Sequence, residues 1–199
     1  VSPSDIPSSM MGFTDSKWKS RIAWAPTNGS FQAMITAMRL LWGEDKTRSW
    51  LQSTQANAPA VYPKNTPIVA AVGAGEADVG FVNHYYLYRF LQEEGDAFGA
   101  RNYHLTEGGP GATVLVAGMG ILKTTENIEN AEKFIDFMLS EVAQQYFASQ
   151  TFEYPMVNGV KTHRLLTPLN EIKNPKIDMV SLDDLRGTQE LLRSVGLIP

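Results

Sequence analysis

Apolar and polar residues follow one another along this chain in a way that predicts an α/β protein. Short apolar stretches, typical of strands, alternate with longer segments in which apolar residues recur every three or four positions, as in amphipathic helices. The helical period is clearest in residues 31–42, which Gly43 ends. Because strands and helices alternate, we expect a mainly parallel central sheet flanked by helices. The strand-like stretches are residues 21–25, 61–62 and 77–82.

The second half of the chain has a less regular pattern. The apolar run 113–122, which contains Gly118 and Gly120, predicts a buried strand with close backbone contacts. Residues 103–105 are a further strand candidate, and Phe134 and Phe137 are expected in the core stripe of an amphipathic helix. Besides residues 31–42, helices are predicted at residues 45–55, 65–73, 84–94, 128–139, 141–149 and 185–195.

Bulk composition limits the function classes. The chain has 199 residues with a formal net charge of −4, 43% hydrophobic and 19% charged residues, which is typical of globular domains. No basic run or basic stripe with interleaved aromatic residues is present, so nucleic acid is not an expected partner. No apolar stretch approaches the roughly 20 residues of a membrane span. The absence of cysteine excludes disulfides, thiolate metal sites and cysteine nucleophiles.

Two adjacent tyrosines, Tyr85 and Tyr86, are the most informative residues for function. They lie where the strand-like run 77–82 gives way to a helix-like run, and Asn83 before them is a favoured helix N-cap type. The positive end of a helix dipole favours an anion, and so favours phenolate over phenol. Phenolate oxygens are hard ligands that match a small, highly charged cation such as Fe3+. The alternative is that both are half-buried helix residues with hydrated hydroxyls.

A second set of residues could bind an anion. Thr27, Asn28, Gly29 and Ser30 lie between a predicted strand and a predicted helix, where backbone N–H groups and the helix dipole favour negative charge. A tight turn with Ser30 as N-cap is the simpler interpretation of this tetrapeptide, and a plain cap is the simpler interpretation of Asn65. Loops at the carboxyl ends of parallel strands meet at one edge, however. The three helix starts therefore predict one polar pocket.

Other constellations are weaker. The three histidines, His84, His104 and His163, have no metal-ligand spacing, and no serine, histidine and acid motif is recognisable. A small α/β enzyme that uses Tyr85 or Tyr86 as a general acid would need a base within hydrogen-bond reach, and the sequence offers no obvious candidate.

Several motifs occur in an order that resembles the periplasmic ferric-iron-binding proteins of bacterial ABC importers, within the class II substrate-binding proteins. These motifs are Lys17-Trp18-Lys19-Ser20-Arg21-Ile22, Pro26-Thr27-Asn28-Gly29-Ser30, Gly75-Glu76-Ala77-Asp78, Asn83-His84-Tyr85-Tyr86 and Glu153-Tyr154-Pro155. The Asn-x-Tyr-Tyr and Pro-Thr-x-Gly elements are fairly specific to the family, and the similarity runs over nearly the whole chain.

The resemblance implies a site. Tyr85 and Tyr86 would coordinate Fe3+, and residues 27–30 would bind a synergistic anion, phosphate or carbonate, with help from Asn65 and Asn83. Some members carry a further tyrosine ligand in the strand before the anion loop, where this chain has Trp24. The implied protein is a periplasmic or extracellular monomer, with a lipid anchor as an option for the full-length precursor, that delivers iron to a membrane permease.

The resemblance also implies an organisation of the chain. Residues 1–115 would form the second lobe with the ligand site, residues 116–166 would belong to the first lobe, and residues 167–199 would pack back on the second lobe. Family members are about half as long again, so we expect a truncated product that starts at Val1 and lacks part of the first lobe. A binding protein for a sugar, a polyamine or an organophosphate remains the alternative within the same class.

Overall fold

The computed structural model describes residues 1–199, which divide into two compact units. The larger unit joins Val1–Val114 with Lys173–Pro199, and the smaller unit is Leu115–Ile172. None of the helices combines the length and apolar character needed to cross a bilayer.

The larger unit is built on a three-stranded parallel sheet in the order β2-β1-β3. In the register, Ala23 of the central strand lies opposite Ala60 and Gly80. Because the strands are parallel, their carboxyl ends lie at one edge, and the loops that leave them begin side by side. The strands are β1 (Ile22–Trp24), β2 (Ala60–Val61) and β3 (Val79–Gly80).

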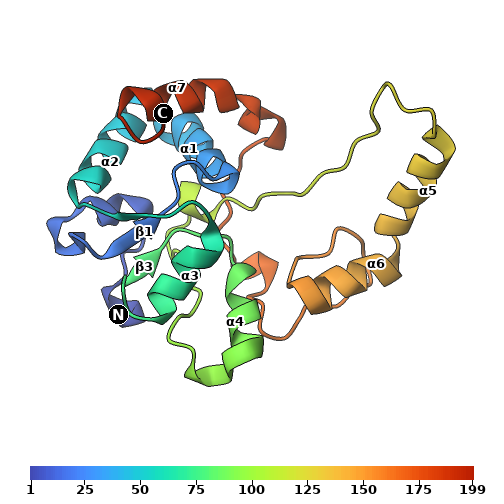
Figure 1. The fold of residues 1–199 in the computed structure, drawn as a ribbon, viewed down its shortest axis with the longest axis horizontal. Coiled ribbons are helices and arrows are strands. Elements are labelled where there is room, and N and C mark those ends of the chain that lie inside the picture. The colour runs from blue at the N-terminus through green and yellow to red at the C-terminus, as the bar shows by residue number, and fades with distance from the viewer. The chain divides into compact units, whose positions relative to one another are not determined.

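Side chains of β1 alternate between two apolar layers, as the two-residue period of a strand requires. Ile22 and Trp24 belong to the larger core, which α1, α2 and α7 cover, whereas Ala23 packs with Ile68 of α3 on the other face (Figure 1). Helix α4 packs against α3. The expected α/β class with helices on both faces of a parallel sheet is therefore confirmed. The helices of this unit are α1 (Gly29–Trp42), α2 (Glu44–Ala56), α3 (Asn65–Gly73), α4 (Tyr86–Glu94) and α7 (Leu185–Ser194).

Gly43 separates α1 from α2. Its φ of +82° lies in the region that side chains rarely adopt, and its N–H donates to the carbonyl of Arg39 as α1 ends. Helix α2 then turns Trp50 into the core, where its Nε1 donates to the carbonyl of Met10 over 2.7 Å. A single glycine therefore lets both helices cover the same face of the sheet.

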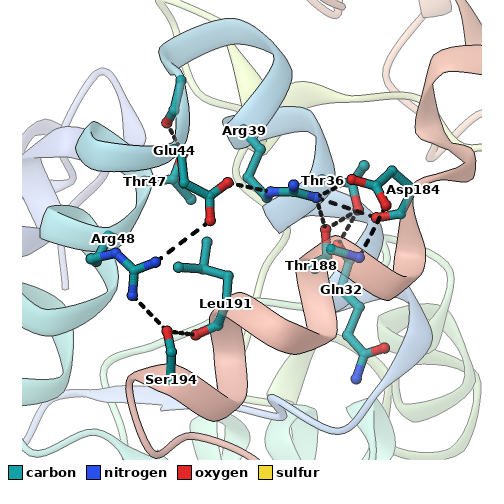
Figure 2. Close-up of polar contacts among 12 residues, drawn as sticks. Gln32, Thr36, Arg39, Glu44, Thr47, Arg48, Asp184, Thr188, Leu191 and Ser194 are labelled. Atoms are coloured by element: carbon teal, nitrogen blue, oxygen red, sulfur yellow. Dashed lines mark hydrogen bonds and ion pairs between the residues drawn. The ribbon is translucent and has the colours of Figure 1, made fainter.

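A polar cluster fastens α7 to α1. Figure 2 shows Arg39 of α1 between two carboxylates, with Nε 2.7 Å from Glu44 Oε2 and Nη1 2.8 Å from Asp184 Oδ2. Beside Arg39, whose Nη1 donates to Thr188 Oγ1 over 3.1 Å, the buried hydroxyls of Thr36 and Thr188 lie 2.7 Å apart. Helix α7 is thus attached to α1, the helix that residues 27–30 lead into.

Asp184 gives a test of this attachment. A hydrogen bond from the Gly187 N–H and the Arg39 guanidinium lower the pKa of Asp184 from its ordinary 3.8. A lowered pKa in the folded state means that the charged carboxylate stabilises the fold above that ordinary value, and that this stability disappears as the pH falls through the lower folded value. We expect Asp184→Asn, which keeps a capping side chain, to lower the urea midpoint at pH 7 and to approach wild type progressively below pH 3.8. An equal deficit at every pH would contradict the ion pair.

The smaller unit keeps its predicted helices but not its predicted core. Helix α5 has no buried residue, and Phe134 and Phe137 are 57% and 56% exposed, so their expected place in a core stripe is wrong within this chain. A helical period shows which residues share a face, but it does not supply the partner that covers the face. The helices are α5 (Ile128–Met138), α6 (Glu141–Tyr146) and a π-helical turn (Phe147–Thr151).

The run 113–122 is not a buried strand. Its residues from 115 onward are exposed, it pairs with no strand, and an added Cβ at Gly118 or Gly120 would meet nothing within 4 Å. The expected strand at 103–105 is also absent. A strand requires a neighbouring strand for its backbone groups, and an apolar run alone does not provide one.

Seven short 3-10 segments complete the chain, at Pro3–Asp5, Met10–Thr14, Ser16–Trp18, Gly95–Ala97, Pro110–Ala112, Leu169–Glu171 and Met179–Asp183.

Candidate metal and anion site

The loop after β1 forms a turn that leads directly into α1. The N–H of Asn28 donates to the carbonyl of Ala25, and Asn28 is the N-cap, since its Oδ1 accepts from the Ser30 N–H at 2.9 Å and from Ser30 Oγ at 2.6 Å. Ser30 is therefore not the cap. Gly29 has no left-handed backbone, and an added Cβ would meet nothing, so its contribution is an uncovered helix N-terminus. Thr27 is exposed beside it.

Asn65 and Asn83 are not the helix caps that their residue type predicts. Helix α3 has Lys64 as its N-cap residue and α4 has Tyr85, and neither side chain caps its helix. The Tyr86 N–H turns back to the backbone carbonyl of Asn83 instead, at 3.4 Å. Both asparagine amides are consequently free to bond to groups from other loops.

The two amides connect the three loops in one hydrogen-bonded chain. Asn65 Nδ2 donates to Ser30 Oγ over 3.2 Å and approaches Asn83 Oδ1 at 3.5 Å. Asn83 Nδ2 in turn lies 3.4 Å from the phenol oxygen of Tyr85. Asn65 is only 2% exposed, so its position is fixed by packing as well as by these bonds. The predicted convergence of the three helix starts is therefore observed between side chains.

The tyrosine pair lies at the end of this chain. The rings of Tyr85 and Tyr86 have their centroids 4.6 Å apart with planes tilted by 33°, and both residues are half-buried. They are neither enclosed in the hydrophobic core nor far apart. The side-chain Nδ2 of Asn83 is a donor beside the phenol oxygen of Tyr85. A donor in this position would stabilise the negative charge of a phenolate.

A third tyrosine on the same helix has a different environment. Tyr88 is buried, and burial raises its pKa, while a hydrogen bond with Asn102 opposes that shift. Asn102 Nδ2 also donates to the carbonyl of His84 over 2.9 Å, which holds the residue before the pair. Sequence reasoning missed Asn102, because no motif surrounds it. Because burial raises its pKa, Tyr88 stays a neutral phenol.

Other candidate ligands are not gathered here. No group of three or more histidine, aspartate and glutamate side chains is placed to hold a metal ion. The ring of His84 packs edge-on to that of Tyr85, at 5.5 Å between centroids, and burial lowers the pKa of His104. Trp24, in the strand before the anion loop, is fully buried against Phe31. The available donors are two hard phenol oxygens for a cation and amide and helix N–H groups for an anion.

Comparison with known proteins gives consistent matches. The family profile described as "Bacterial extracellular solute-binding protein" matches residues 2–178. The "Major ferric iron-binding protein" of Neisseria meningitidis serogroup B is 29% identical over 202 residues, which is 99% of this chain and 60% of that protein. The "Fe(3+)-binding periplasmic protein" of Serratia marcescens is 30% identical over 200 residues, covering 100% of this chain and 59% of that protein.

Solved structures agree with this. Iron-bound HitA from Pseudomonas aeruginosa superposes with a TM-score of 0.92 at 34% identity, covering 98% of this chain and 63% of that one. A Trichodesmium protein (IdiA, FutA) in complex with iron and citrate gives 0.84 at 27% identity, covering 100% and 65%. The chain thus spans about three fifths of the length of the curated relatives that it matches.

Proposed function

Because the chain belongs to the bacterial extracellular solute-binding proteins, we propose that it binds ferric iron through Tyr85 and Tyr86 together with a small anion. The named relatives from Neisseria and Serratia are ferric-iron-binding proteins, and HitA was solved with iron bound. The family is one of binding proteins, so the alternative of an enzyme with a tyrosine acid is set aside.

One observation carries the proposal: a hydrogen-bonded chain joins the start of α1 to the phenol oxygen of Tyr85. It runs from Ser30 through Asn65 and Asn83, so the anion half and the metal half of the site share a single network. A bare Fe3+ held by two phenolates keeps a net positive charge and open coordination positions. A small anion at the helix N-terminus would neutralise that charge and fill those positions.

The anion we propose is phosphate or carbonate. Its oxygens would accept from the free N–H groups at the first turn of α1 and from the amides of Asn65 and Asn83. Asn28 would serve this site indirectly, because its side chain caps α1 by accepting hydrogen bonds from the Ser30 N–H and Oγ. Thr27 and Gly29 contribute backbone at an open surface. The citrate in the Trichodesmium complex is consistent with an anionic co-ligand in such sites.

For the whole protein we propose a periplasmic monomer that hands its iron to a membrane permease. Residues 115–172, the compact unit that contains the predicted segment 116–166, would then belong to the first lobe. Their exposed large apolar side chains, such as Phe134, Phe137 and Val142, support this assignment because many exposed apolar residues are typical of a surface that another part of a protein covers. Residues 173–199, with α7 on α1, would complete the second lobe.

A thermal-shift panel tests the ligand class. A ligand that binds only the native state raises the unfolding temperature by mass action. We expect a shift with ferric iron supplied as a citrate chelate plus phosphate, and none with a sugar, a polyamine, an organophosphate or the chelating buffer alone. A shift produced by one of the organic solutes, with none for iron, would replace the proposed cargo.

Iron affinity is expected to fall with pH. Each phenol that binds as phenolate releases one proton, so below the ordinary phenol pKa of ~10 each tyrosine contributes about a tenfold loss of affinity per pH unit. The slope of log Kd against pH should be about −2 for wild type and about −1 for Tyr86→Phe. The measurement is competition with a chelator whose own proton and iron equilibria are known. Identical slopes for the two proteins would remove Tyr86 from the ligand set.

A further inference from the structure

We propose that Gln32 is a positioning residue of the anion site, which aims the backbone N–H of Thr27 toward the bound anion and is itself held by Gln189 of α7. The inference rests on the proposed function, since it assigns a residue that tunes the anion half of that site. Gln32 lies in the second turn of α1, faces inward and is 6% exposed.

The Gln32 side chain makes one bond at each end of its amide. Its Nε2 donates to the carbonyl of Pro26 over 3.2 Å, and its Oε1 accepts from Gln189 Nε2 over 3.2 Å. The orientation of the amide is chemically determined, because a carbonyl only accepts and so must face the nitrogen of Gln32. Gln189 must then present its own nitrogen to the remaining oxygen.

Fixing the Pro26 carbonyl also fixes the next N–H. The C=O of Pro26 and the N–H of Thr27 belong to one planar peptide, and in a trans peptide these two groups point in opposite directions. No peptide in the chain is cis. The carbonyl points to the buried Gln32, so the Thr27 N–H points away from the core at an exposed residue beside the start of α1. If this peptide rotated, the anion would meet a carbonyl oxygen in place of a donor.

The backbone carbonyl of Gln32 is hydrogen-bonded as well. Figure 2 shows the inward face of α1 with Gln32 and Thr36 in successive turns, where Thr36 Oγ1 donates to the Gln32 carbonyl over 3.0 Å. Thr36 also contacts Thr188, the neighbour of Gln189 in sequence. The C-terminal helix therefore reaches the anion loop through Gln189, Gln32 and Pro26, although it contains no predicted ligand.

The test compares Gln32→Met with Thr36→Val in the full chain. The methionine has similar length but cannot donate to the Pro26 carbonyl. The valine removes the hydrogen bonds of the Thr36 hydroxyl to Thr188 and to the Gln32 backbone carbonyl, but it keeps both side-chain bonds of Gln32. The readout is the ratio of the iron Kd in phosphate-free buffer to the Kd in phosphate buffer. We expect this ratio to fall at least fivefold in Gln32→Met and to stay within twofold of wild type in Thr36→Val, with phosphate-free affinity unchanged in both.

A second readout needs no iron. The Thr27 amide signal in a two-dimensional NMR spectrum should shift on phosphate addition in wild type and Thr36→Val, and should not shift in Gln32→Met.

If Gln32→Met does not fold, Gln189→Met leaves the Pro26 bond but releases the amide, and its ratio should fall at least twofold. An unchanged ratio in a folded Gln32→Met, or an equal loss in Thr36→Val, overturns the positioning role alone. A wild-type ratio of one overturns the proposed anion site together with this inference, while iron binding is tested separately by the phosphate-free Kd.

Discussion

Removing both phenol oxygens, by Tyr85→Phe with Tyr86→Phe, is expected to abolish the visible charge-transfer band of the ferric complex. Such a band arises when a phenolate oxygen donates electron density to Fe3+, and phenylalanine has no oxygen to donate. The ring centroids lie 4.6 Å apart and both residues are half-buried, so the two side chains are neighbours at the same surface. Each single variant should keep a weaker, shifted band, and the double variant should also lose iron affinity by several orders of magnitude.

Tyr88→Phe is the matched control for this experiment. It removes a hydroxyl from the same helix, but that hydroxyl is buried, has a raised pKa and hydrogen-bonds with Asn102. We expect a loss of roughly 0.5–1.5 kcal/mol in unfolding free energy and no change in the band. A band that persists in the double variant, or that disappears in Tyr88→Phe, would contradict the assignment of Tyr85 and Tyr86.

The second large effect is expected at the anion half of the site. Asn65→Ala removes the amide that connects Ser30 to Asn83, and a hydrogen bond to a charged group contributes about 1.5–3 kcal/mol, or about 10- to 150-fold in affinity. The expected result is a loss of that size in iron affinity measured with phosphate or carbonate present. In anion-free buffer the variant should approach wild type, because the tyrosine ligands remain. Chelator competition in the two buffers gives both values.

Asn57→Ala is the control for this variant. Asn57 is also a buried asparagine whose side chain makes two hydrogen bonds, but its Nδ2 donates to the backbone carbonyls of Phe13 and Asp15 in the N-terminal segment of the same unit. We expect it to lower stability by an amount comparable to Asn65→Ala and to leave the anion dependence intact. Equal losses for Asn65→Ala with and without anion would show that the asparagine acts on the metal or the fold, and not on an anion.

Much of the fold follows from local rules that act within a few residues. The alternation of short apolar runs with helical periods predicted the α/β class, and the observed parallel sheet with helices on both faces confirms it. Gly43 was the predicted end of a helix and is where α1 ends. The ordered motifs indicated a substrate-binding protein, and the match over residues 2–178 confirms the wider family of bacterial extracellular solute-binding proteins. The roles of individual site residues stay predictions.

The asparagines show where local rules fail. Asn65 and Asn83 occur beside helix starts, where their type favours capping, yet neither caps its helix. Their amides bond to each other, to Ser30 and to Tyr85. The bonded pair that is most distant in sequence, Asn65 and Ser30, is 35 positions apart. Local propensity ranks residue types at a cap, but it contains no information about an acceptor that another loop brings within reach.

The sequence by itself determined which segments form helices, which class of fold they build and which two tyrosines stand out chemically, because each depends on neighbours a few residues away. Only the tertiary structure decided that three loops share one hydrogen-bonded chain, that Gln32 bonds to the Pro26 carbonyl and Asn102 to the His84 carbonyl, and that residues 115–122 and the apolar face of α5 are exposed within this chain. Those outcomes depend on contacts between segments that are distant in sequence. The type of a residue, apolar or polar, does not specify which distant residue it will contact.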